Sequence, residues 1–160
     1  TKGTLDIRVM DLRGNLLFEK KKNVTLPPNT SKIQFSAPVK NVLGGKKPNE
    51  VFVNARFTEN VKQGKIVTNN YYFDRYKNID FPKADIRITS VPARDGYDLT
   101  VSSDVFARGV FLSLDGIDNF FSDNYFDLLP GEPVTIHVTT SLDKDTFDKQ
   151  LRSESLADTY

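Results

Sequence analysis

Short runs of alternating apolar and polar residues, separated by turn residues, constrain the fold of this chain more than any other feature. Leu5, Ile7 and Val9 alternate with polar neighbours, which is the period of a strand with one buried face. Comparable runs occur at residues 16–22, 33–35, 51–57, 66–73, 83–91, 97–101, 105–114 and 133–140. Short strands with Gly, Pro, Asn and Asp between them are typical of β-sandwiches. We therefore expect an all-β protein.

The pattern divides the chain near residues 81–83 into two halves, each of the size of a small domain. We expect two small immunoglobulin-like β-sandwich domains in tandem, at residues 1–81 and 82–140. The first half contains about five strands, whereas such a sandwich usually has seven. We therefore expect the first domain to lack its opening strands, which would precede Thr1.

Residues 141–160 break the β pattern. Asp145 is placed to cap a short helix that carries Phe147 and Leu151 four residues apart on one face. We expect this C-terminal helical tail to dock back on the domains through Leu156 and Tyr160.

The most patterned stretch is residues 120–132. It contains four aromatic residues, Phe120, Phe121, Tyr125 and Phe126, around a Ser-Asp-Asn turn signal, and it closes on Leu-Leu-Pro-Gly. The turn is expected to be capped by the side chains of Asp123 and Asn124. Phe126 and Leu128 should then share the buried face of a strand, and Pro130–Gly131 should reverse the chain.

Composition argues against several classes of function. Lys and Arg number 22 and Asp and Glu 21, for a net charge of +1, and nucleic-acid binding usually requires a strongly basic face. No apolar run approaches the roughly 18 residues that cross a bilayer. The absence of Cys excludes disulfides and thiolate metal sites. We expect no cofactor, no nucleic-acid partner and no membrane partner.

No catalytic constellation is recognisable. His137 is the only histidine, lies in an alternating strand and should point outward, without a nucleophile-elbow motif elsewhere. The pair Asn49–Glu50 resembles a glycosidase motif but begins a strand after a flexible loop. Calcium is suggested by four loop aspartates, although their spacing matches no EF-hand; they are Asp115, Asp118, Asp123 and Asp127. Side-chain-capped turns explain these aspartates more simply, and we predict no catalytic and no metal residues.

Exposed tyrosines are the remaining candidates for ligand binding, because a flat ring with a polar tip can stack on a sugar. The candidates considered are Tyr71, Tyr72, Tyr97 and Tyr125, and we select Tyr71, Tyr72 and Tyr125 as sugar-stacking residues. The competing interpretation is that these rings fill the cores of the domains or cover a seam between them.

The sequence Ser-Asp-Asn-Tyr-Phe-Asp-Leu-Leu-Pro-Gly-Glu at residues 122–132 resembles the last domain of β-mannosidases of glycoside hydrolase family 2. Chains of that family end in an immunoglobulin-like domain with a similar aromatic stretch. The resemblance extends to residues 70–73, 81–82, 99–107, 110–112 and 152–160. It is most specific from residue 66 onward.

The resemblance implies a non-catalytic role. The family's catalytic glutamates lie in a central β/α barrel, and this chain has no barrel pattern, so none of them can be assigned here. The parent enzyme would remove terminal non-reducing β-D-mannose with retention of configuration. The partners of the chain would then be the barrel and the other domains of the parent, with mannose-containing glycans as a further partner.

Two hypotheses about function remain open. The first is a C-terminal accessory fragment of a β-mannosidase-like enzyme, and the second is an autonomous carbohydrate-binding or surface-interaction module. The cysteine-free composition is compatible with a periplasmic or secreted bacterial protein, which is the location we expect.

Overall fold

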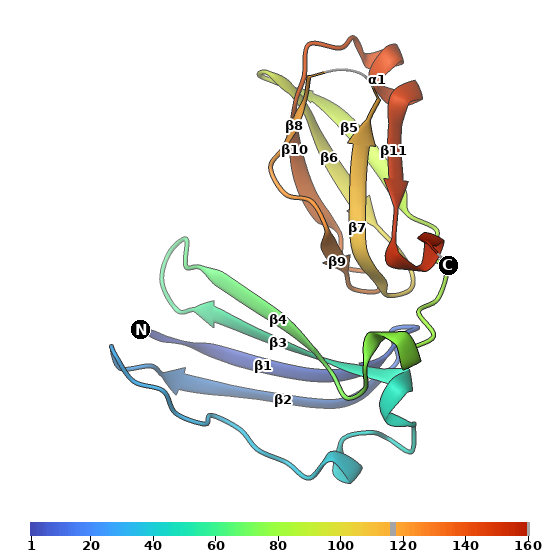
Figure 1. Ribbon diagram of the computed structural model, residues 1–160. Coiled ribbons are helices and arrows are strands. Elements are labelled where there is room, and N and C mark those ends of the chain that lie inside the picture. Colours follow the sequence, from blue (N-terminus) through green and yellow to red (C-terminus); the bar gives the residue numbers. More distant parts are fainter. Residues whose placement is uncertain (116–117, 160) are drawn as a thin grey trace. The chain divides into compact units, whose positions relative to one another are not determined.

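The computed structural model describes residues 1–115 and 118–159. The chain forms two compact units, Thr1–Asp80 and Phe81–Tyr160 (Figure 1). Each unit is built from antiparallel strands, as the period-two pattern predicted, and each is described here by itself.

The first unit is one four-stranded sheet with the order β2-β1-β3-β4. Its strands are β1 (Lys2–Asp11), β2 (Leu16–Thr25), β3 (Val51–Glu59) and β4 (Ile66–Tyr72). Short 3-10 helices follow at η1 (Val39–Asn41), η2 (Pro48–Glu50) and η3 (Tyr76–Asn78). The strand predicted at residues 33–35 is wrong, because this segment has no ladder partner and is irregular from residue 26 to 38. Two prolines before it and one after it lack the N–H that a ladder needs.

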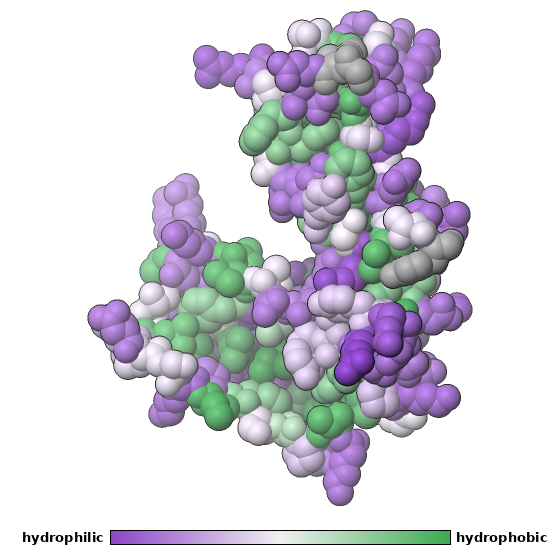
Figure 2. All heavy atoms as spheres, in the orientation of Figure 1, coloured by the Kyte–Doolittle hydropathy of each residue, from purple (hydrophilic) through white to green (hydrophobic). Residues whose placement is uncertain are grey.

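The two faces of this sheet differ in character. On one face, Val9 and Val51 pack with Val42 from the long connection between β2 and β3. Farther along the same face, towards β4, Val67 and Tyr71 are each 61% exposed. The connection therefore covers only part of the apolar face, and green apolar side chains reach the surface of the first unit (Figure 2).

The opposite face of the same sheet combines the buried side chains of Met10, Phe52 and Tyr72 with a polar network around Asn54. The side chain of Asn54 is completely buried there. It accepts a hydrogen bond from Arg8 Nη2 at 3.0 Å and donates to Thr68 Oγ1 and Asn70 Oδ1, both at 2.9 Å. This network joins β1, β3 and β4 through side chains, and it satisfies an amide that would otherwise cost free energy to bury.

The second unit is a sandwich of two sheets, with the strand orders β5-β6-β10-β8 and β11-β7-β9. Its elements are β5 (Arg87–Ala93), β6 (Gly96–Ser102), β7 (Ala107–Leu114), β8 (Phe120–Phe121), β9 (Phe126–Leu128), β10 (Val134–Thr139), α1 (Lys144–Gln150), β11 (Leu151–Glu154) and η4 (Leu156–Thr159). Tyr97, Leu99 and Val101 of β6 are all buried in its core, which confirms the face predicted for that strand.

A bulge interrupts β7 where the sequence has Arg108–Gly109. The register of β7 with β9 shifts between Ala107 and Val110, and Gly109 adopts a φ of 57°, which favours glycine. The Asp127 carboxylate accepts hydrogen bonds from the Gly109 N–H at 3.0 Å and from Arg108 Nη1 at 3.1 Å. The Asp127 side chain therefore anchors the bulge.

The C-terminal segment differs from the expectation in three respects. The residue that caps α1 is Asp143, whose carboxylate accepts from Thr146 N at 3.0 Å, and not Asp145. Leu151 begins β11 instead of extending the helix, so β10 is not the last strand. Leu156 begins η4, and the docking predicted for Tyr160 lies outside the described residues.

The aromatic stretch enters the core through β9. Leu128 is completely buried, whereas Phe126 is only half-buried and packs at the margin of the core. Pro130–Gly131 makes the expected turn, with Glu132 N donating to Leu129 O at 3.0 Å and a φ of 71° at Gly131. These are the features of a type II turn.

Because Leu128 and Phe126 are buried to different extents, truncating them should lower the free energy of unfolding by different amounts. We expect Leu128→Ala to lower the free energy of unfolding by about 2 to 5 kcal/mol, because it leaves a cavity in a sealed core. Phe126→Ala should cost less, and Phe120→Ala, at a ring that is 68% exposed, should serve as a near-neutral control. Urea denaturation of the three variants measures this order. A cost for Phe126→Ala equal to that for Leu128→Ala would contradict the assignment of burial.

Candidate functional surfaces

Tyr72 does not belong to a sugar-binding surface, and its selection as a stacking residue is corrected here. Only 9% of the residue is exposed. Its ring stacks on Phe52 with centroids 6.4 Å apart and meets Tyr76 edge-on at 5.2 Å. Alternation places Tyr72 on the opposite face from Tyr71, so both rings could not share one platform.

Tyr71 is exposed but has apolar surroundings. Its ring meets Phe73 edge-on at 5.4 Å. In the strand register it lies opposite Val53 on β3, on the incompletely covered apolar face that also carries Val67. Asn69, which is exposed, lies between Val67 and Tyr71 on the same face, so the ring has one polar neighbour among apolar ones.

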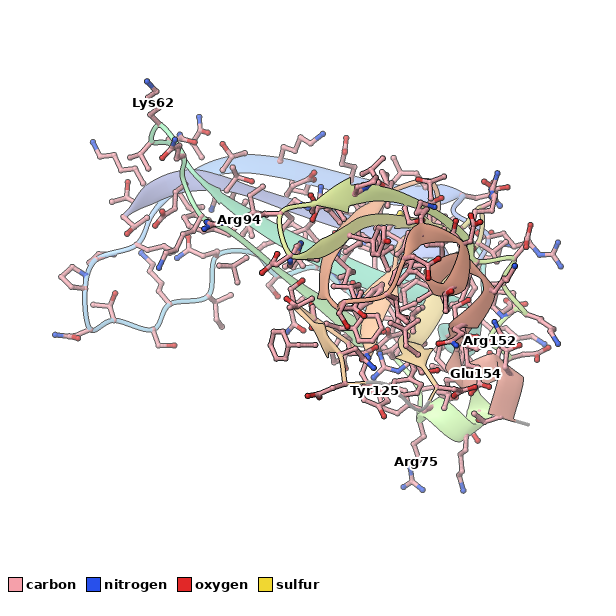
Figure 3. The ribbon with its side chains drawn as sticks, turned by 90° about the horizontal axis from the view of Figure 1, so that it is seen from above. Lys62, Arg75, Arg94, Tyr125, Arg152 and Glu154 are labelled. Carbon is pink, nitrogen blue, oxygen red and sulfur yellow. The ribbon has the colours of Figure 1, made fainter. Side chains whose placement is uncertain are left out.

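Tyr125 is the most exposed of the three candidates, at 70%. Its ring stacks on Phe111 of β7, with centroids 4.9 Å apart and an interplanar angle of 23°. Its backbone has a φ of 60°, a left-handed conformation that is unfavourable for a bulky residue. Figure 3 shows the side chain projecting from the second unit.

Asn124 determines where Tyr125 lies. Its Oδ1 accepts from Leu112 N and its Nδ2 donates to Leu112 O, both at 2.8 Å, so the side chain takes the place of a neighbouring strand. Asn124 N donates to Asp123 Oδ1 at 2.8 Å, which confirms the predicted side-chain-capped turn. The clamp onto β7 was not predicted, because it depends on a strand that is distant in sequence.

His137 has two acidic partners that the sequence analysis did not identify. Its Nδ1 lies 2.7 Å from Asp98 Oδ1 and its Nε2 lies 2.9 Å from Asp95 Oδ1. The register of β6 with β10 pairs His137 with Asp98 directly. The hydrogen bond to Asp98, followed by that to Asp95, raises the pKa of His137 above its ordinary value. Both ring nitrogens thus face carboxylates, and Ser122 Oγ accepts from the backbone N–H of His137 at 2.9 Å. The arrangement is an ion-pair bridge from the β5–β6 turn and β6 to β10.

The remaining acidic candidates have local structural partners. Glu50 Oε2 accepts from Lys47 N at 2.7 Å, and Asn49 Nδ2 donates to Asn78 O at 3.1 Å. Asp127 anchors the bulge in β7. Within residues 1–115 and 118–159, no group of three or more His, Asp or Glu side chains is placed to hold a metal ion.

A shallow groove in the second unit lies between β5 and α1. Ile86, Ile88 and Leu151 form its apolar part. At one side Asp148 accepts from Ser90 Oγ at 2.7 Å and pairs with Lys144. Asp148 lines the groove, and its carboxylate is already engaged by these partners within the domain.

Comparison with known proteins identifies the domain type of both units. Residues 1–78 match the model of a mannosidase Ig/CBM-like domain, and residues 81–159 match that of the Ig-fold domain of mannosidases. These two mannosidase-type immunoglobulin-like domains together account for nearly the whole chain. The chain belongs to the mannosidase immunoglobulin-like domains.

A solved structure agrees with this assignment. The β-D-mannosidase from Dictyoglomus thermophilum superimposes with a TM-score of 0.79 at 19% sequence identity, over 97% of this chain and 18% of that chain. At this identity the likeness shows the fold. No curated protein gives a significant match.

The mannosidase-type domains thus span less than a fifth of the length of the enzyme that they resemble. None of the helices in the described part of the chain is long and apolar enough to span a membrane. The most exposed aromatic surface of the second mannosidase domain is the Tyr125–Phe111 pair, and that of the first is the apolar face around Tyr71.

The Asn124 clamp predicts a large effect from a small truncation. We expect Asn124→Ala to cost about 1 to 3 kcal/mol, because it leaves both polar backbone groups of the buried Leu112 without their partner. Asp123→Ala is the matched control: it removes one exposed hydrogen bond in the same turn, and should cost less than about 1 kcal/mol. Thermal and urea unfolding provide the comparison. Equal costs for the two variants would show that the clamp is not stabilising.

The His137 bridge predicts a dependence of stability on pH. Because the pKa of His137 is raised in the folded state, its stabilisation is complete below the ordinary histidine pKa of about 6.5 and is lost as pH rises through the folded-state pKa. We expect His137→Gln to lower the urea midpoint clearly at about pH 5.5 and only slightly at about pH 9. Asp98→Asn should show the same trend. A difference from the unmodified protein that stays constant with pH would contradict the bridge.

Proposed function

We propose that this chain is a non-catalytic C-terminal accessory piece of a β-mannosidase-like glycoside hydrolase. One observation carries the proposal: two different mannosidase domain models match in tandem and leave almost no residue over. The proposed parent hydrolyses terminal non-reducing β-D-mannose residues with retention, using glutamates of a barrel domain. The accessory piece packs on the rest of the parent and stabilises it.

The half-covered sheet of the first unit supports a packing role. An apolar face of a sheet requires a second layer to bury it. Here the connection between β2 and β3 covers the β1 side, while Val67 and Tyr71 on β4 are left 61% exposed. The proposed occupant of this face is another part of the parent chain, which would complete the sandwich.

The chemistry of the described residues is consistent with a non-catalytic role. A retaining glycosidase requires two carboxyl groups about 5 to 5.5 Å apart that flank the sugar. The candidate carboxylates Glu50 and Asp127 instead accept from a backbone N–H of a turn and anchor the β7 bulge. Asp148, beside the groove, pairs with Lys144. We further propose a periplasmic or secreted location in a bacterium, with neither nucleic acid nor membrane as a partner.

The test compares the 160-residue chain with the full-length product of its gene. We expect the full-length protein to hydrolyse an aryl β-mannoside and the isolated chain to show no turnover. Hydrogen exchange should show β4 exchanging faster in the isolated chain than in the full-length protein, because the face around Val67 and Tyr71 is covered only in the latter. In both proteins, β10 of the second unit is the internal control and should exchange alike.

Two results would contradict this proposal. Hydrolysis by a clean preparation of the isolated chain would overturn the non-catalytic role. A full-length product without β-mannosidase activity, or with unchanged exchange at β4, would refute the parent enzyme or the docking face respectively. A signal peptide directly before Thr1 would instead favour the autonomous module.

A further inference from the structure

Tyr125 combines exposure with a strained backbone. The residue is 70% exposed, so its ring contributes little to the core. Its φ of 60° lies where Gly and Asn are favoured and a bulky side chain is not. Conformations of this kind persist where the surrounding structure imposes them, and they cluster at sites that bind ligands. The Asn124 clamp onto Leu112 is the imposing contact.

The ring of Tyr125 is presented as a platform. Phe111 lies behind it in nearly parallel stacking, at 4.9 Å and 23°. The contact restrains the side chain without covering it, since most of Tyr125 is still accessible. A restrained ring with one open face loses little conformational entropy when it binds a flat ligand.

The surroundings of this platform are polar. In the register of β11 with β7, Glu154 lies directly opposite Phe111 and Arg152 opposite Ser113. Opposite residues of an antiparallel pair point to the same face, so Glu154 is a neighbour of the stacked rings. Both Arg152 and Glu154 are exposed, although Arg152 Nη1 also donates to the carbonyl of Lys149 at 2.6 Å. Figure 3 labels both of these side chains and Tyr125 on the second unit.

We propose that Tyr125, backed by Phe111 and flanked by Glu154, is a binding site for a pyranose ring of a glycan chain. A pyranose presents C–H groups on its faces and hydroxyl groups around its edge. The C–H face would stack on Tyr125, and the Glu154 carboxylate would accept hydrogen bonds from the hydroxyls. The site does not depend on the proposed parent enzyme, because it is complete within the second unit.

Tyr71 supplies the contrast. It is nearly as exposed, at 61%, but its neighbours Phe73, Val53 and Val67 are apolar, and Asn69 is the polar residue of β4 that lies beside it on this face. A sugar there would leave most of its hydroxyls beside hydrocarbon, which is unfavourable. The same exposure thus indicates a protein-covered face at Tyr71 and a sugar-binding surface at Tyr125.

The experiment is an NMR titration of the 160-residue chain with β-1,4-linked mannohexaose. We expect saturable shifts at Tyr125, Phe111 and Glu154, and a loss of affinity on the order of tenfold in Tyr125→Ala, the size of an aromatic stacking contribution. Tyr125→Phe should retain most of the affinity because it keeps the ring. Tyr71→Ala is the matched control and should bind as the unmodified chain does.

The variant Tyr125→Asn distinguishes a loss of sugar binding from a loss of folding. Asn accepts the left-handed backbone, so this variant should fold at least as well as the parent chain and still lose binding. Cellohexaose, titrated in parallel, distinguishes recognition of mannose from recognition of pyranose rings in general. The absence of saturable shifts with both sugars, or an equal loss of affinity in Tyr71→Ala, would overturn the proposal. Neither outcome bears on whether the full-length protein is a β-mannosidase.

Discussion

Burial of the apolar face of each sheet is the constraint on which this structure depends. The second unit meets it internally, because its two sheets close over Leu99, Leu128 and Ile136, and Phe147 of α1 seals the same core. The first unit has one sheet and covers its apolar face with an irregular connection that reaches only part of it. That difference separates a self-sufficient domain from one whose surface is suited to contact with more protein.

In the second unit, two side chains bond backbone groups that a neighbouring strand would otherwise bond. These side chains determine the surface around Tyr125. The Asn124 amide bonds both backbone groups of Leu112, and the Asp127 carboxylate takes the N–H of Gly109 in the bulge. Both act on β7, and together they define the path of the chain on either side of Tyr125. The strained backbone of that tyrosine is therefore a consequence of contacts that stabilise the sandwich.

Polar side chains elsewhere in the chain also form structural contacts within their own units. Asn54 ties three strands of the first sheet together, and His137 bridges a hairpin turn to its neighbouring strand. His137 was considered as a catalytic residue, and both side chains are engaged by partners within their own unit. An accessory role agrees with this pattern, since catalysis requires groups whose bonding is completed by substrate.

The sequence by itself determined the fold class, most strands and the Pro130–Gly131 turn, because alternation and turn residues are local signals that tertiary contacts did not override. The family resemblance was also present in the sequence, in the stretch from residue 122 to 132, and the domain models confirm it. Prediction from the sequence was wrong where two local structures were both possible. The cap of α1 is Asp143 and not Asp145, and Leu151 pairs with β7 instead of extending the helix.

Only the tertiary structure decided which aromatic residues are accessible. Tyr71, Tyr72 and Tyr125 are equivalent as residue types. Strand alternation buries Tyr72 against Phe52 and leaves Tyr71 on a largely apolar sheet face. The bonds of Asn124 to the distant strand β7 hold the neighbouring Tyr125 in an exposed position. The same holds for the partners of His137, which lie about 40 residues away in sequence. Exposure and pairing depend on contacts between segments that are far apart in the chain, and periodicity within one segment carries no information about them.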